Sequence, residues 1–94
     1  MSKNIVTAKH ISDMISDSEV HVSTIFDKVT VVSVKLPNGF VITESSGCVD
    51  PANYSEEMGR EICMERITNK LWELEGYLLA DKLAKEKDNG IYIR

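Results

Sequence analysis

Three polar side chains in the C-terminal half of the chain share one face of an expected helix. Arg66, Asn69 and Lys70 lie three and four residues apart, so a helix presents a guanidinium, an amide and an ammonium on the same side. Such a set suits a phosphate and the edge of a base. The alternative is a solvated face on which Lys70 pairs with Glu73 at i, i+3.

A second candidate site lies in residues 45–53, which read SSGCVDPAN. Small residues let a ligand approach the backbone closely, at a point where the amides of an expected helix begin to point outward. Asp50 and Asn53 would then contact the ligand. The alternative is that Ser and Gly make the turn while Asp50 and Asn53 cap the helix, since capping alone explains those residue types.

Phe40, Tyr54 and Trp72 are the aromatic residues nearest these features. Aromatic faces are where a nucleobase stacks, although most aromatics at helical or strand spacing are core residues. We expect Trp72 to be packed and Phe40, just past a turn, to be exposed. Phe40 therefore joins the candidate ligand-binding residues.

Nucleophilic and metal-binding residues form no recognisable constellation. His10, His21, Cys48 and Cys63 are scattered, and no pair of them has helical ligand spacing. The chain has no nucleophile elbow, no H-E-x-x-H, no Walker loop and no Rossmann fingerprint. We expect a binding protein rather than an enzyme, with no metal and no cofactor.

Length and charge limit the partners. A chain of 94 residues with 43% hydrophobic residues predicts a single domain over residues 1–94. Its net charge of -4 disfavours sequence-independent binding to long DNA or RNA. A small anionic ligand needs only two or three well-placed cations, so it stays open.

The cysteines and the N-terminus predict the compartment. Two cysteines outside any CxxC pair indicate free thiols in a reducing cytosol. The start, MSKNIVTAKHISDMI, lacks the apolar core of a signal peptide, and no run is long enough to cross a bilayer. We expect a cytoplasmic protein without membrane contact, located in the host cytoplasm if it is phage-encoded.

The elements that would position these residues give an α+β fold. Ile11, Met14 and Ile15 predict a short helix that Thr7 caps. Residues 20–26 hint at a strand, and KVTVVSVKL, PNG and FVIT predict an antiparallel β-hairpin or small sheet. The segment GIYIR at the C-terminus is either an edge strand or a frayed end.

One long C-terminal helix follows, with a start marked by Asp50-Pro51 and by Asn53 with Glu56. Its apolar positions recur at steps of mostly three to five: Tyr54, Met58, Ile62, Ile67, Leu71, Leu74 and Leu78.

Unbroken, this helix would be about 50 Å long, whereas a compact chain of this length has a radius of gyration of about 12 Å. It must therefore bend near Gly76 or project into a partner subunit. A second apolar stripe of Trp72, Leu79 and Leu83 favours a homo-oligomer held through this helix. The alternative is a helical hairpin bent at Gly76.

Three blocks of the sequence resemble a known family. LPNGF, SSGCVDPANYSEEMGRE and KLWELEGYLL are similar to the pattern of small tailed-phage and prophage proteins typified by the gene-sixty-six product of phage Sf-six and the gene-forty-nine product of phage N-four. The resemblance covers about residues 29–83. It implies a phage or prophage origin rather than a particular reaction.

Phages devote many small proteins to counter-defence, and the anti-Thoeris and anti-CBASS sponges are an analogy of context and fold. These small oligomers sequester cyclic nucleotide signals without cleaving them. By that analogy the chain is a sponge for a cyclic or nucleotide-derived immune signal, with its ligand at a subunit interface. A base would stack on Phe40 or an arginine face, Arg66 and Lys70 would meet phosphates, and Asp50 and Asn53 would bind ribose or base.

The rival hypothesis is a protein-binding module. In that case the stripe of Trp72, Leu79 and Leu83 docks on a host protein and inhibits it, instead of pairing with its own copies. A monomer with that stripe exposed favours this module, and a stable oligomer favours the sponge. A virion structural component has little support, because the chain is short and has no repeats.

Overall fold

The fold is a three-stranded sheet with one long helix across it. The computed structural model describes residues 4–87, and its elements are α1 (Ala8–Ser16), β1 (Glu19–Ile25), β2 (Val29–Lys35), β3 (Val41–Gly47), the short 3-10 helix η1 (Pro51–Asn53) and α2 (Glu56–Lys87). The strands form an antiparallel meander in the order β1-β2-β3. The predicted α+β fold is therefore confirmed, and the weak strand signal at residues 20–26 corresponds to β1.

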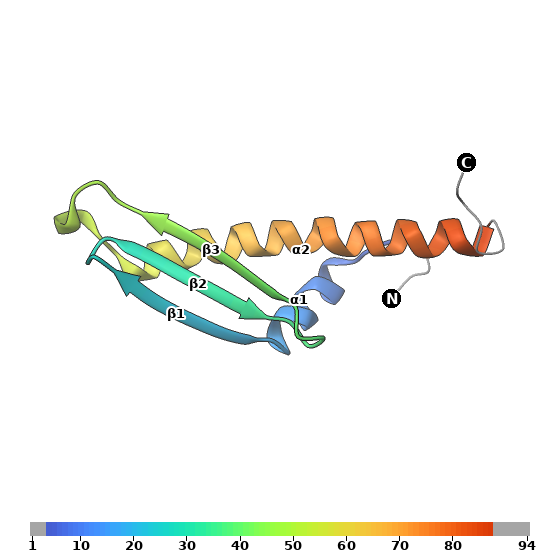
Figure 1. The fold of residues 1–94 in the computed structure, drawn as a ribbon. Coiled ribbons are helices and arrows are strands. Elements are labelled where there is room, and N and C mark those ends of the chain that lie inside the picture. Colours follow the sequence, from blue (N-terminus) through green and yellow to red (C-terminus); the bar gives the residue numbers. More distant parts are fainter. Residues whose placement is uncertain (1–3, 88–94) are drawn as a thin grey trace.

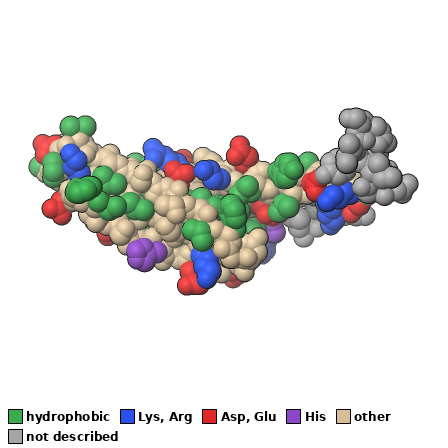
Figure 2. Space-filling view, viewed as in Figure 1, with side chains coloured by type: hydrophobic (Ala, Val, Ile, Leu, Met, Phe, Trp, Pro, Cys, Tyr) green, Lys and Arg blue, Asp and Glu red, His purple; other side chains and the backbone are tan. Residues whose placement is uncertain are grey.

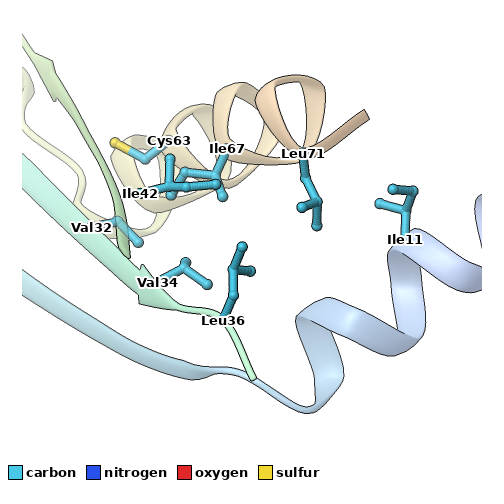
Figure 3. Packing of buried hydrophobic residues seen from close by; sticks show 8 residues of the cluster. All are labelled: Ile11, Val32, Val34, Leu36, Ile42, Cys63, Ile67 and Leu71. Atoms are coloured by element: carbon cyan, nitrogen blue, oxygen red, sulfur yellow. The ribbon is translucent and has the colours of Figure 1, made fainter. Parts of the chain in front are cut away.

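The core lies between the sheet and the first half of α2, which packs against β2 and β3. Antiparallel partners share a face, so Thr30, Val32 and Val34 of the central strand turn toward α2 together with their partners on β3. Figure 3 shows the sheet side chains pointing at α2, with Ile11 of α1 closing one end of the cluster. The buried hydrophobic residues are Ile11, Val32, Val34, Leu36, Ile42, Cys63, Ile67 and Leu71.

Helix α1 begins as the sequence predicts. The Thr7 side chain accepts a hydrogen bond from the backbone N–H of His10, which satisfies one of the free amides of the first turn. The imidazole of His10 then contacts the Glu75 carboxylate of α2 at 2.8 Å. This polar contact and the buried side chain of Ile11 hold α1 against α2 near the β2–β3 turn (Figure 1).

The start of α2 differs from the prediction. Asp50 caps the separate turn η1, with its carboxylate accepting from the N–H of Ala52 at 3.0 Å. Tyr54 is extended, and α2 starts at Glu56, where the Ser55 hydroxyl accepts from the N–H of Met58 at 3.2 Å. Two capping sequences follow each other here, and the second one starts the long helix.

The buried face of α2 also differs in its first half. Met58 and Ile62, which were predicted to be apolar core positions, are exposed by 62% and 37%. Gly59 and Cys63 occupy the buried positions one residue further on, and the stripe then continues through Ile67 and Leu71 as predicted. A Cβ on Gly59 would overlap the side chain of Thr30, so the glycine lets helix and sheet approach closely.

Helix α2 runs without a break through Gly76 to Lys87, so the alternative of a helical hairpin bent at Gly76 is wrong. Its second half extends past the end of the sheet (Figure 1), which gives a radius of gyration of 17.1 Å and extents of 58 × 28 × 20 Å. The large side chains most exposed there are Tyr77 (71%) and Leu78 (57%). Leu79 and Leu83 are half-buried, and GIYIR lies outside the described residues.

The β1–β2 turn has an unusual backbone. Phe26 and Asp27 both have a φ of 56°, and the N–H of Lys28 donates to the carbonyl of Ile25 at 3.2 Å. The bond closes a tight turn at Phe26 and Asp27, within a loop of three residues between the paired Ile25 and Val29, and positions of positive φ in hairpin turns normally take Asn or Gly. A side chain in this left-handed region costs about 1–2 kcal/mol per residue.

The two glycines of α2 give a matched test of the close contact between helix and sheet. Gly59→Ala should lower the free energy of unfolding by about 1–3 kcal/mol, because the added methyl group overlaps Thr30. Gly76→Ala meets no atom within 4 Å, so it should raise that free energy by about 0.5–1 kcal/mol through helix propensity. Urea unfolding of both variants measures the difference, and an equal gain for both would contradict the close packing.

Candidate functional site

Arg66 and Lys70 lie side by side along the edge of β3. The guanidinium Nη1 of Arg66 donates to the backbone carbonyl of Ser45 at 2.8 Å. The ammonium of Lys70 lies 3.6 Å from the carboxylate of Glu44. Lys70 therefore pairs across to β3 instead of pairing with Glu73 along the helix.

These two cations retain capacity for a ligand. A guanidinium has five N–H donors and an ammonium has three, and the contacts to Ser45 and Glu44 occupy few of them. The Lys70 side chain is 49% exposed, and Arg66 is an exposed residue. Asn69 is exposed on the same helix. An anion that binds Lys70 would have to compete for its ammonium with the half-buried carboxylate of Glu44.

The loop after β3 and the 3-10 helix η1, which include Asp50 and Asn53, lie at the end of the sheet where β1 turns into β2 (Figure 1). The Asp50 carboxylate caps η1 by accepting from the N–H of Ala52, as the capping interpretation has it for this residue, whereas the start of α2 is capped by Ser55 and not by Asn53. The loop is also tied to the turn, because the N–H of Cys48 donates to the carbonyl of Lys28 at 2.9 Å and the Lys28 ammonium donates to the carbonyl of Val49 at 3.3 Å. Both Asp50 and Asn53 are exposed.

Phe40 lies at the other end, next to the β2–β3 turn (Figure 1). It is 53% exposed, as the sequence predicts. Its ring lines an apolar groove of about 210 Å³ between that turn and α2. The groove is lined by Met14, Leu36, Asn38, Phe40, Leu71, Leu74, Glu75, Tyr77 and Leu78.

The six candidate residues thus occupy three separate places on one protomer. Arg66, Asn69 and Lys70 come together on α2, and Asp50 and Asn53 come together beside η1. Phe40 belongs to the opposite end of the sheet (Figure 1). A single copy of the chain does not bring the aromatic ring to the polar loop.

Comparison with known proteins places the chain in a family. Residues 3–83 match the family described as "Phage protein (N4 Gp49/phage Sf6 gene 66) family". The chain belongs to this phage protein family. The matched residues cover α1, the sheet and most of α2, and they include every candidate residue. No curated protein and no solved structure gives a significant match to the chain.

Tyr54 has a role in this phage protein that its place in the apolar pattern did not indicate. Its hydroxyl is hydrogen bonded to the hydroxyls of Thr30 at 2.7 Å and Thr24 at 2.8 Å. Thr24 also donates to the Glu56 carboxylate at 3.0 Å. Thr30 is fully buried, so this network satisfies its hydroxyl and fixes the loop that carries Asp50 and Asn53.

Phe26 is the other residue that the sequence-based reasoning missed. It is 84% exposed at the β1–β2 turn, close to the loop of Asp50. The sequence signal for this turn is weak. Two β-rich runs are separated by Phe-Asp-Lys, which lacks the glycine or asparagine of a usual hairpin turn.

The two cysteines have different environments. Burial raises the pKa of the Cys63 thiol, and its S–H points to the carbonyl of Thr30 at 3.8 Å. Cys48 is half-buried and its S–H donates to the carbonyl of Asp50 at 3.2 Å. Over residues 4–87, no three His, Cys, Asp or Glu side chains are grouped as metal ligands, and no helix is long and apolar enough to cross a membrane.

Thiol reactivity tests this difference. A thiolate is the reactive form, so an aromatic disulfide reagent should label Cys48 rapidly in the native protein and Cys63 only after unfolding. Native Cys48→Ser should then be almost unreactive. Rapid labelling of Cys63 in native Cys48→Ser would contradict the buried position of this thiol.

The raised pKa of Cys63 also predicts a pH dependence of stability. As the pH rises above about 8.5, the unfolded chain loses its thiol proton first, while the folded chain keeps it. The free energy of unfolding should therefore fall as the pH rises through this range. In Cys63→Ala this fall should be shallower. Identical slopes in the wild-type protein and in Cys63→Ala would contradict it.

Proposed function

We propose that this phage protein is a counter-defence sponge, which binds a cyclic or nucleotide-derived immune signal and sequesters it without cleaving it. The observation that carries the proposal is the pair of cations on α2. Arg66 and Lys70 are held beside β3 by Ser45 and Glu44 and keep free donors toward solvent. A preorganised guanidinium and ammonium are suited to phosphate oxygens.

The ligand site is proposed to form between copies of the chain. One copy separates Phe40 from Asp50 and Asn53 by the length of the sheet (Figure 1). A second copy laid antiparallel along α2 would bring the Phe40 of one protomer toward the Asp50 and Asn53 of its partner. The projecting half of α2 supports such an assembly, because it leaves Tyr77 and Leu78 exposed.

In this site the roles follow from the chemistry of each group. Arg66 and Lys70 would meet phosphate, Asn69 would reach a base or ribose edge, and Phe40 would stack on a base. Asp50 and Asn53 would complete the polar contacts. Sequestration requires recognition alone, so we assign no catalytic residue and no cofactor.

A second candidate function is supported by the apolar groove. Phe40, Tyr77 and Leu78 form an exposed hydrophobic border around it, and such a surface also suits a helix or loop of a host protein. The stripe proposed for this role from the sequence was Trp72, Leu79 and Leu83. In the structure Trp72 is 37% exposed rather than packed as expected, and it lines a groove against α1, while Leu79 and Leu83 are half-buried. We therefore place the surface for a host protein on the Phe40 side, where Tyr77 and Leu78 are more exposed.

Thermal unfolding with a panel of nucleotides tests the sponge. Cyclic dinucleotides, cyclic trinucleotides and ADP-ribose derivatives are each added to protein of known oligomeric state. A ligand that binds the folded form alone raises the melting temperature. At a ligand concentration of a hundred times Kd it adds about 2.7 kcal/mol to the free energy of unfolding. We expect one class to give this shift and to be recovered intact after denaturation.

Arg66→Ala should abolish the shift, whereas Arg60→Ala on the same helix should keep it. The melting temperature of each variant without ligand is measured first, because Arg66→Ala also removes the bond to Ser45. No shift with any nucleotide would argue against the sponge and favour the host-protein module. Recovery of a cleaved product would overturn sequestration without cleavage.

A further inference from the structure

Glu44 places a negative charge inside the proposed phosphate site, which Arg66 and Lys70 form. Its carboxylate lies 3.6 Å from the Lys70 ammonium, and its side chain is 22% exposed whereas that of Lys70 is 49% exposed. Glu44 is the strand partner of the buried Val32, so its side chain lies on the face of the sheet that α2 covers. A half-buried charge is screened by salt less than an exposed one. Glu44 therefore acts on any anion that binds beside it.

The same carboxylate also opposes Arg66. Burial is the main cause of the raised pKa of the Cys63 thiol, and the Arg66 guanidinium lowers that pKa while the Glu44 carboxylate raises it. Arg66, Lys70 and Glu44 together carry two positive charges and one negative charge, which leaves a single net positive charge. One turn beyond Lys70, Glu73 adds another carboxylate rather than a cation.

The rest of the surface contributes little attraction for a highly charged anion. On the face that Figure 2 shows, the described Lys and Arg side chains are interspersed with Asp and Glu side chains. The chain as a whole has a net charge of -4. Long-range attraction of a multiply charged anion is therefore weak, and the charge of a bound phosphate must be balanced locally.

The edge of β3 supplies uncharged donors at the same place. Strand β3 is at the edge of the sheet, and its pairing with β2 begins where the N–H of Leu36 donates to the carbonyl of Phe40. Because bonded pairs alternate along an antiparallel ladder, the N–H and C=O groups of Thr43 and Ser45 point away from β2. The bond from Arg66 to the carbonyl of Ser45 at 2.8 Å agrees with this direction. Such N–H groups can donate to a phosphate oxygen without adding charge.

We propose that Glu44 selects the ligand of this site by the charge of its phosphate, admitting phosphodiesters and disfavouring terminal phosphomonoesters. A phosphodiester carries one negative charge, which the single net positive charge of the site balances. A terminal phosphate carries about −1.5 to −2 charges at pH 7, so its additional charge would lie unbalanced beside the Glu44 carboxylate. The inference rests on the proposed function, because it concerns the same site, and it narrows the ligand class to phosphodiesters.

NMR titration of isotope-labelled protein tests this selection with two pairs of nucleotides that share base and sugar. Cyclic AMP is compared with AMP, and cyclic di-AMP is compared with the linear dinucleotide pApA, which has a terminal phosphate. In the wild-type protein the cyclic member of each pair should bind more tightly and shift the backbone N–H signals of Thr43 and Ser45. In Glu44→Gln the Kd of the linear member should fall about five- to tenfold relative to that of the cyclic member.

The change in this ratio is the readout, because ring closure by itself also alters affinity. Glu61→Gln makes the same change in net charge at an exposed position of α2, about 140° around the helix from Arg66. It should leave the ratio of the two Kd values in each pair unchanged. Glu44→Gln keeps the size of the side chain, and its melting temperature without ligand is measured first because the variant loses the ion pair with Lys70.

The same ratio in Glu44→Gln as in the wild-type protein, or an equal change in Glu61→Gln, overturns the inference. Tight binding that is lost in Arg66→Ala would still support the sponge in that case. Charge selection that appears only at a millimolar Kd would defeat sequestration alone, since so weak a site retains little ligand. If none of the four nucleotides binds at millimolar concentration, charge selection is contradicted, whereas a response to another member of the thermal panel would keep the sponge.

Discussion

The close approach of α2 to the central strand is the contact on which the rest of the structure depends. It becomes possible where Gly59 faces Thr30, with no room for a Cβ between them. From that point Cys63, Ile67 and Leu71 follow along one face of the helix and are fully buried against the sheet. At the same place the Tyr54 hydroxyl is hydrogen bonded to the buried hydroxyl of Thr30. The polar and the apolar contacts therefore favour the same position of α2 on the sheet.

This contact determines where the candidate site residues lie. Once Gly59 and Cys63 face the sheet, Arg66 and Lys70 fall on the flank of α2 nearest β3 and meet Ser45 and Glu44. The helix direction then carries its second half beyond the strands. The sheet is too short to cover a helix of 32 residues, and the exposed Tyr77 and Leu78 are the consequence.

Much of this fold could be predicted from the sequence, because local signals were strong and agreed with one another. The Pro-Asn-Gly turn and the β-branched runs gave the hairpin, and Thr7 gave the start of α1. The buried face of α2 was harder, since Gly59 and Cys63 do not stand out in an apolar pattern whereas Met58 and Ile62 do. A small residue at a close contact is set by the neighbouring strand, which the helix sequence alone does not contain.

The candidate site was predictable in its residue types and not in its assembly. Exposure of Phe40 follows from its position just past a turn, and the shared face of Arg66 and Lys70 follows from helical spacing, whereas the separation of Phe40 from Asp50 depends on the whole sheet. The sequence did not reveal the turn at Phe26, because phenylalanine is unusual at a position with positive φ. Such an exception is informative once the backbone is known. In natural proteins local residue preferences mostly agree with the overall fold, and the exceptions concentrate at functional sites.

The elongated shape connects these observations. A chain of 94 residues has a limited core, and this one places it at one half of α2 and leaves apolar surface at both ends. Its candidate ligand groups are divided between the two ends. The antiparallel pair of copies that we propose for the ligand site would bring these divided groups together, because it places the Phe40 end of one protomer beside the Asp50 end of the other.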